Sequence, residues 1–222
     1  MRMCRKLRRS GSLEISDISR ENVPDCRDVH VFEEEIILKR MKTKDLVLCA
    51  MFVALIAVGA FIKVPVPVVP FTLQFLFTML AGLLLGPGNG ALAVVIYIVL
   101  GLAGLPIFTQ RGGPGYIFQP SFGYIIGFAA AAYVTGRIAN EKSHPGYGRL
   151  LAANFIGLFI VYAFGLVYYY VISNFVLNTP IGLWPLFLYC FLLAVPGDIA
   201  LCILAAAIGK RMIPMIREGR LG

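Results

Sequence analysis

Residues 42–62 read KTKDLVLCAMFVALIAVGAFI, a short basic stretch that runs directly into an uncharged apolar segment. Five more apolar segments follow it along the chain. A helix over the shorter ones reaches about 22 to 26 Å, against a hydrocarbon core of roughly 30 Å, so flanking residues or local bilayer thinning must complete the span. The pattern predicts an all-α, polytopic membrane protein, a bundle of six transmembrane helices over residues 46–62, 71–85, 91–105, 122–136, 150–176 and 184–208.

The composition also indicates a lipid environment. Of the 222 residues, 59% are hydrophobic and 14% charged, and the mean hydropathy is +0.80. Soluble globular proteins rarely combine these values. Residues 1–40 hold 9 of the 20 Lys and Arg, so the remaining body has 11, too few to form the basic face that nucleic-acid binding requires.

The first 40 residues differ from the rest of the chain. They lack the apolar core of a signal peptide and any clear amphipathic period. We predict two parts: an N-terminal extension over 1–40, disordered or upstream of the true start, and a six-helix membrane domain over 41–222. Met41 is then the natural start, and the intact mass of the native protein tests this.

The basic residues of the body predict an orientation. With six spans, both termini lie on the same side of the membrane. A cytoplasmic location places nine basic residues of the body inside and leaves two, Lys63 and Arg111, outside, as the positive-inside rule requires. We expect a multi-pass plasma-membrane protein with both termini in the cytoplasm.

Asp198 is the acidic residue that lies inside a predicted span, in the run LLAVPGDIALCILAAAIG. A carboxylate there costs several kcal/mol unless it faces protein or water. It can anchor a ligand or an ion, or form a structural hydrogen bond to a neighbouring helix. The preceding Pro196 and Gly197 favour the first interpretation, because they weaken the helix and leave backbone groups free to line a cavity.

Polar and aromatic residues near the outer ends of the spans are candidates for the same site. Phe71 and Gln74 open the second span, and the Gln74 amide both donates and accepts hydrogen bonds. The outer loop before the fourth span contains Gly113, Tyr116 and Tyr124. Glycines allow close backbone approach and aromatic rings supply flat contact surface, so this loop is a candidate lid.

Small residues mark one face of the first span. Ala50, Ala54 and Ala57 lie at i, i+4 and i+7, which permits close approach of another helix. That helix can belong to this chain or to another subunit.

Enzymatic motifs are missing from the sequence. It contains no P-loop, no G-x-S-x-G and no H-E-x-x-H. The five cysteines are odd in number and widely spaced, which fits neither a disulfide framework nor a zinc site. The two histidines, His30 and His144, lie in polar segments. We therefore expect no catalytic residue, no metal and no cofactor, and any transport must draw its energy from elsewhere.

Four motifs, in order and with suitable spacing, together resemble one family. They are VPVPVVPFTLQ at 64–74, AGLLLGPGNGALAVVIYIVLGLAGLPIF at 81–108, GGPGYIFQPSFGYIIGF at 112–128 and PGD at 196–198. They resemble the BioY family, the biotin-binding substrate-capture (S) components of energy-coupling factor (ECF) transporters. The resemblance covers about residues 41–210.

The resemblance implies a function and its partners. A bacterial protein of this kind captures extracellular biotin with high affinity, and a transmembrane coupling subunit with two cytoplasmic ATPases drives uptake. Ala50 and Ala54 match the A-x-x-x-A motif that docks on the coupling subunit, and residues 112–119 would be the gate. The implied ligand is biotin, and the candidate substrate-binding residues are Asp198, Gln74, Phe71, Gly113, Tyr116 and Tyr124.

One position departs from the family pattern. The family commonly has a lysine three residues after the aspartate of its G-D motif, and Leu201 stands there in this chain. Asp198 matches that aspartate, whose carboxylate suits the ureido N–H groups of biotin. Leu201 keeps open the same role for another vitamin or a biotin precursor. An intramembrane enzyme and a purely structural subunit are the remaining alternatives.

Overall fold

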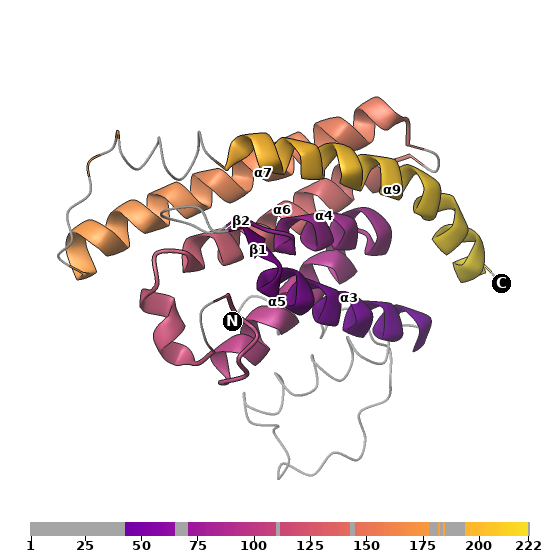
Figure 1. Ribbon diagram of the computed structural model, residues 1–222. Helices are drawn as coiled ribbons and strands as arrows, with labels where there is room; N and C mark the ends of the chain where they lie inside the picture. Colours follow the sequence, from indigo (N-terminus) through magenta and orange to yellow (C-terminus); the bar gives the residue numbers. More distant parts are fainter. Residues whose placement is uncertain are drawn as a thin grey trace, which may run out of the picture. The chain divides into compact units, whose positions relative to one another are not determined.

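The computed structural model describes residues 43–64, 71–109, 112–142, 145–177, 182, 184 and 194–221. Within these residues the chain forms six α-helices, two short helical turns and two antiparallel β-strands of two residues each (Figure 1). The predicted six-helix fold is therefore confirmed. The elements are α3 (Thr43–Phe61), β1 (Lys63–Val64), β2 (Phe71–Thr72), α4 (Gln74–Leu85), α5 (Pro87–Leu102), η1 (Pro114–Phe118), α6 (Phe122–Asn140), α7 (Tyr147–Val171), η2 (Ile172–Val176) and α9 (Val195–Leu221).

Helix α4 lies at the centre of the bundle. It packs against α3, α5, α6 and α9, and all of its residues except Phe77 are buried. Figure 1 shows α9 along one side of α4, with α3 and α5 on the other. Because α4 is surrounded by protein, its apolar side chains form the core of the bundle rather than a lipid-facing surface.

The helices fall into two classes by length. Four apolar segments are long enough to cross a membrane, and they are Thr43–Phe61, Phe122–Asn140, Tyr147–Val176 and Val195–Ile216. The apolar helices Gln74–Leu85 and Pro87–Leu102 are shorter. At about 1.5 Å per residue they reach roughly 18 and 24 Å, less than the roughly 30 Å of a hydrocarbon core, so flanking residues or local bilayer thinning must complete the span.

The connection between α4 and α5 differs from the sequence prediction. The predicted spans 71–85 and 91–105 leave GPGNG at 86–90 between them, but α5 already begins at Pro87, and Gly86 alone joins the two helices. Gly86 has φ +89° and ψ 179°, a conformation open essentially to glycine, while proline fits the first turn because it needs no N–H acceptor there. A Cβ on Gly90 would lie 2.8 Å from the Ala81 carbonyl oxygen, which explains how closely the helices meet.

Helices α6 and α7 pack closely over most of their lengths. Gly123 and Gly127 of α6 face α7, where a Cβ would lie 2.2 Å from Tyr168 Cβ and 3.0 Å from Val161 Cα, respectively. Small residues at such spacing let two membrane helices approach closely and gain van der Waals contact. This pair carries several of the aromatic side chains described below.

The start of α9 differs from the predicted sixth span. Residues 185–193 of that span lie outside the described residues, and α9 begins at Val195. Asp198 therefore occupies the first turn of a helix, not its interior. Pro196 is compatible with this position because the first-turn N–H groups have no partner within the helix.

Candidate ligand-binding site

Asp198 and Tyr162 form a hydrogen bond between α9 and α7. The Tyr162 hydroxyl donates to Asp198 Oδ2 at 2.5 Å, and the Tyr162 side chain is buried. Asp198 is partly buried, in the first turn of α9, where the helix dipole favours a negative charge. In the described part of the chain, no lysine or arginine forms an ion pair with this carboxylate.

Tyr124 of α6 lies against this pair. Its ring packs edge-to-face on the Tyr162 ring, with centroids 6.0 Å apart and an interplanar angle of 88°. A Cβ on Gly165 of α7 would come within 2.3 Å of the Tyr124 ring, so this glycine makes the space that the ring occupies. Three helices thus bring Asp198, Tyr162 and Tyr124 together, and we call these residues the tyrosine–aspartate cluster.

One turn further along α9, a second polar contact joins the same helices. The Asn154 amide nitrogen of α7 donates to the Cys202 carbonyl oxygen at 2.9 Å, and both residues are fully buried. Leu201, next to Cys202, is also buried. The position where the family commonly has a lysine is therefore apolar and packed.

Gln74 lies in a different part of the bundle, at the first residue of α4. It is 2% exposed, and its amide is next to the hydroxyl of Tyr97 on α5, which donates to the Ile107 carbonyl oxygen at 3.0 Å. Apart from its approach to the Tyr97 hydroxyl, Gln74 Nε2 has no hydrogen-bond partner among the described residues. A buried donor without an acceptor is costly, and a ligand acceptor would remove that cost.

A row of ring contacts continues from Tyr97 into the loop between α5 and α6. Neighbouring centroids are 4.4 to 6.3 Å apart, within the range of favourable aromatic pairs. We call this the aromatic row: Tyr97, Phe108, Tyr116, Phe122 and Tyr168.

Tyr116 is the member of the aromatic row that the loop contributes. It is buried in η1, and its hydroxyl lies 3.2 Å from Ser121 Oγ. Burial raises the pKa of Tyr116 above its ordinary value. The Tyr168 hydroxyl of α7 donates to the Ile117 carbonyl oxygen, which fixes η1 against that helix.

Gly113 precedes η1 and shapes the turn into it. Its φ is +115°, and its N–H donates to the Gly101 carbonyl oxygen at the end of α5, at 2.7 Å. Lys63 Nζ reaches the Thr109 carbonyl oxygen at 3.5 Å, so the end of α3 and this loop lie at the same end of the bundle. Arg111 lies outside the described residues.

The predicted substrate-binding residues thus fall into two groups. Asp198 and Tyr124 belong to the tyrosine–aspartate cluster. Tyr116 and Gly113 lie in the loop between α5 and α6, and the aromatic row leads from this loop to Tyr97, which lies next to Gln74. The side chain of Phe71 lies outside the part that the structure describes. Sequence reasoning missed Tyr162 and Tyr97; the available signal was a tyrosine hydroxyl within an otherwise apolar run.

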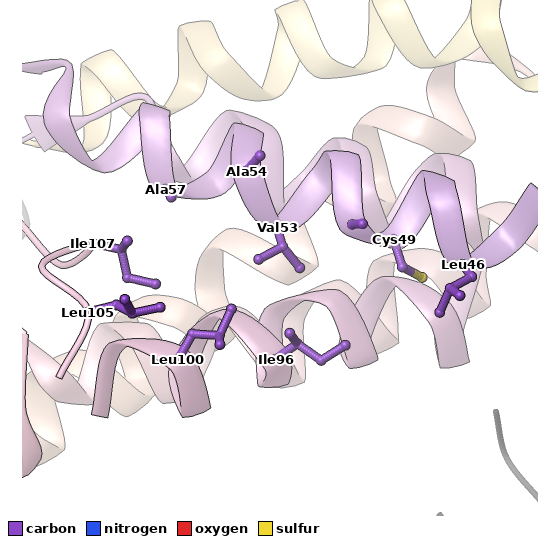
Figure 2. Close-up of a pocket in the computed structure, with 10 residues that line it drawn as sticks. Leu46, Cys49, Val53, Ala54, Ala57, Ile96, Leu100, Leu105 and Ile107 are labelled. Carbon is purple, nitrogen blue, oxygen red and sulfur yellow. The ribbon is translucent and has the colours of Figure 1, made fainter. Parts of the chain in front are cut away.

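The small-residue face of α3 lines an apolar groove. The groove has a volume of about 390 Å³ and lies between α3 and α5, as Figure 2 shows. Ala50 and Ala54 are exposed there, whereas Ile96 and Leu100 of α5 form the opposite wall. None of the predicted substrate-binding residues lines this groove, so it is separate from the tyrosine–aspartate cluster.

The described residues contain no group of three or more His, Cys, Asp or Glu side chains that could hold a metal ion. The polar groups of the tyrosine–aspartate cluster, of the aromatic row and of Gln74 are hydroxyls, one carboxylate and an amide. Such groups suit the recognition of the uncharged, hydrogen-bonding part of a ligand.

Comparisons with known proteins point to one family. The family model described as "BioY family" matches residues 34–218. A probable biotin transporter BioY of Lysinibacillus sphaericus is 46% identical over 184 residues, covering 83% of this chain and 94% of the relative. The biotin transporter BioY of Thermotoga maritima is 42% identical over 123 residues, covering 55% of this chain and 72% of the relative.

A solved structure gives the same result for the fold. The crystal structure of the S-component for biotin from an ECF-type ABC transporter matches with a TM-score of 0.65 and 29% sequence identity. The match covers 78% of this chain and 94% of that protein. These relatives are transporters rather than enzymes, and the resemblance predicted from the sequence is confirmed. The chain is a membrane protein that belongs to the BioY family.

Proposed function

We propose that this chain captures biotin with high affinity from outside the cell, as the substrate-binding subunit of an ECF-type transporter. The names of the relatives and the biotin S-component structure support this ligand. The observation on this chain that carries the proposal is the Asp198 carboxylate, held by Tyr162 at the start of α9 within an apolar bundle. An ionisable residue placed inside a membrane protein usually serves binding or transport.

The chemistry of biotin suits the polar groups in the site. Its ureido ring presents two N–H donors, and the Asp198 carboxylate can accept a hydrogen bond from one of them. Its ring system and side chain are largely apolar and match the aromatic residues around Tyr116 and Tyr124. Gln74 Nε2 would donate to an acceptor atom of the ligand. The outer loop with Gly113 would cover the bound molecule, and Phe71 would contribute a further apolar contact.

Equilibrium binding of radiolabelled biotin to purified, detergent-solubilised protein tests the proposal. We expect tight one-to-one binding, and Asp198→Ala should weaken it by about 10- to 100-fold, since a hydrogen bond to a charged group contributes roughly 1.5–3 kcal/mol. Asp45→Ala, in the first turn of α3, is the matched control and should bind normally. Displacement of biotin by thiamine or riboflavin, or tighter binding of dethiobiotin, would instead identify another vitamin or a precursor as the ligand.

The groove of α3 and α5 supports a second part of the proposal. Ala50 and Ala54 would dock on a transmembrane coupling subunit that works with two cytoplasmic ATPases. Both alanines are exposed, so their own chain leaves this face open to another helix. Small residues along an apolar groove allow the close approach on which membrane-helix association depends.

Ala54→Leu tests the docking surface. The larger side chain would fill part of the groove, and we expect co-expressed coupling subunit and ATPases to lose co-purification with the variant while it still binds biotin. Val47→Phe adds bulk to an exposed position of α3 that does not line the groove, and it should assemble normally. Normal assembly of Ala54→Leu would contradict this docking surface.

A further inference from the structure

We infer that Tyr162 positions the anchor of the ligand site, by holding Asp198 through Oδ2 so that Oδ1 is left to accept a hydrogen bond from the ligand. This inference rests on the proposed function, in which Asp198 binds biotin. It assigns a role to a residue that no sequence motif marks.

The geometry of the hydrogen bond supports this role. The Tyr162 hydroxyl and Asp198 Oδ2 are 2.5 Å apart, at the short end of the range for a hydroxyl bonded to a carboxylate. A hydroxyl has one proton to donate, and Tyr162 commits it to this oxygen. The bond joins residues 36 positions apart, so it fixes the start of α9 relative to α7.

The surroundings hold the tyrosine in place. Its side chain is 4% exposed, and the Tyr124 ring packs perpendicular to its own. Gly165, one turn after Tyr162 on α7, leaves the space for the Tyr124 ring. A ring that is packed on its faces and edges directs its hydroxyl to a fixed point, and the carboxylate rotamer follows.

The inference also accounts for an anchor that has no cation beside it among the residues that the structure describes. Leu201 lies three residues further along α9, on the same face as Asp198, and has no group to donate. Tyr162 supplies the hydrogen bond but adds no positive charge. The carboxylate then keeps its full attraction for N–H donors and repels anions. The site would therefore select the ureido end of biotin and orient its carboxylate away.

A double-mutant cycle tests the inference on the purified full-length chain. The dissociation constant for radiolabelled biotin is measured for wild type, Tyr162→Phe, Asp198→Ala and the double variant, at concentrations high enough to measure weak binding. We expect Tyr162→Phe to weaken binding by about 10- to 100-fold. The double variant should bind no more weakly than Asp198→Ala alone, because Tyr162 acts through the carboxylate.

Two further variants make the outcome specific. Tyr133→Phe removes an exposed hydroxyl from α6 and should bind like wild type. Leu201→Lys in the Tyr162→Phe background offers Asp198 a donor from its own helix and should recover part of the affinity, which a merely structural role of Tyr162 would not predict. If Tyr162→Phe alone is poorly folded, the affinity for biotin is measured on the variant that carries both Tyr162→Phe and Leu201→Lys.

Each result has one meaning. The inference is overturned if Tyr162→Phe binds biotin as tightly as wild type. It is also overturned if the loss of affinity in the double variant equals the product of the losses in the two single variants. Either result leaves biotin capture intact. No biotin binding by folded wild type overturns the proposed function itself, and the role of Tyr162 toward biotin with it.

Discussion

At the scale of single residues, the site depends on side chains that hold one another. Asp198 accepts a hydrogen bond from Tyr162, and the Tyr162 ring packs against Tyr124. The Tyr124 ring in turn occupies the space that Gly165 leaves open. None of these contacts involves a formal positive charge. The affinity of the site should therefore be sensitive to small changes in packing as well as to loss of the carboxylate.

Gly165→Ala tests that sensitivity. The new methyl group would overlap the Tyr124 ring and displace it from its position against Tyr162, and overpacking of this kind costs roughly 1–3 kcal/mol. We expect weaker biotin binding and a lower melting temperature in detergent. Gly148→Ala, in the first turn of α7 with no atom within 4 Å of the new Cβ, is the control and should leave both values unchanged. Wild-type binding by Gly165→Ala would show that the position of Tyr124 does not matter.

The sequence identified Asp198 because a carboxylate in an apolar run is conspicuous. It could not identify Tyr162, since a tyrosine in such a run can equally face lipid, a helix interface or a ligand, and the rotation of α7 decides among these. Gln74 was ambiguous for the same reason. Its burial and unpartnered Nε2 are consequences of tertiary packing that hydropathy does not contain.

At the scale of elements, the six helices were predictable and one turn was not. Apolar length indicates a membrane span because a helix is the simplest way to satisfy backbone hydrogen bonds in lipid. The segment at 86–90 reads as a loop by composition, yet Pro87 begins α5, because α4 and α5 meet closely enough to need glycine at their junction. Local composition does not report such contacts.

The α4–α5 junction yields a stability prediction. Gly86→Ala forces a side chain into a backbone conformation open essentially to glycine, and it should lower the free energy of unfolding by about 1–3 kcal/mol. Gly88→Ala, two residues later in α5 with open space around the new Cβ, should be neutral or stabilising because alanine favours helix. Thermal unfolding of both variants in detergent measures the difference, and equal stability would contradict the role of Gly86.

At the scale of the whole molecule, polar features separate toward the two ends of the bundle. Lys63 contacts the loop that follows α5, and Arg149 forms an ion pair with Glu141 near the connection between α6 and α7. The basic residues predict that the first end faces outward and the second faces the cytoplasm. The candidate gate would then lie on the outside, where biotin arrives.

Thiol labelling of intact cells tests this orientation. Each cysteine is introduced alone into a cysteine-free background. A membrane-impermeant maleimide should label Lys63→Cys in whole cells, and it should label Lys142→Cys only after the cells are lysed. Both positions are exposed, so accessibility to the reagent differs by the membrane side and not by burial. The reverse labelling pattern would place the candidate gate in the cytoplasm and contradict capture from outside.

The central claim is that the Asp198 carboxylate receives the ureido ring of biotin, and a structure of the protein with bound biotin tests it most directly. We predict one ureido N–H of biotin at hydrogen-bond distance, about 2.7–3.2 Å, from Asp198 Oδ1, with the Tyr162 hydroxyl still hydrogen-bonded to Oδ2. Biotin bound with its ureido ring away from α9, or with its own carboxylate facing Asp198, would contradict the account.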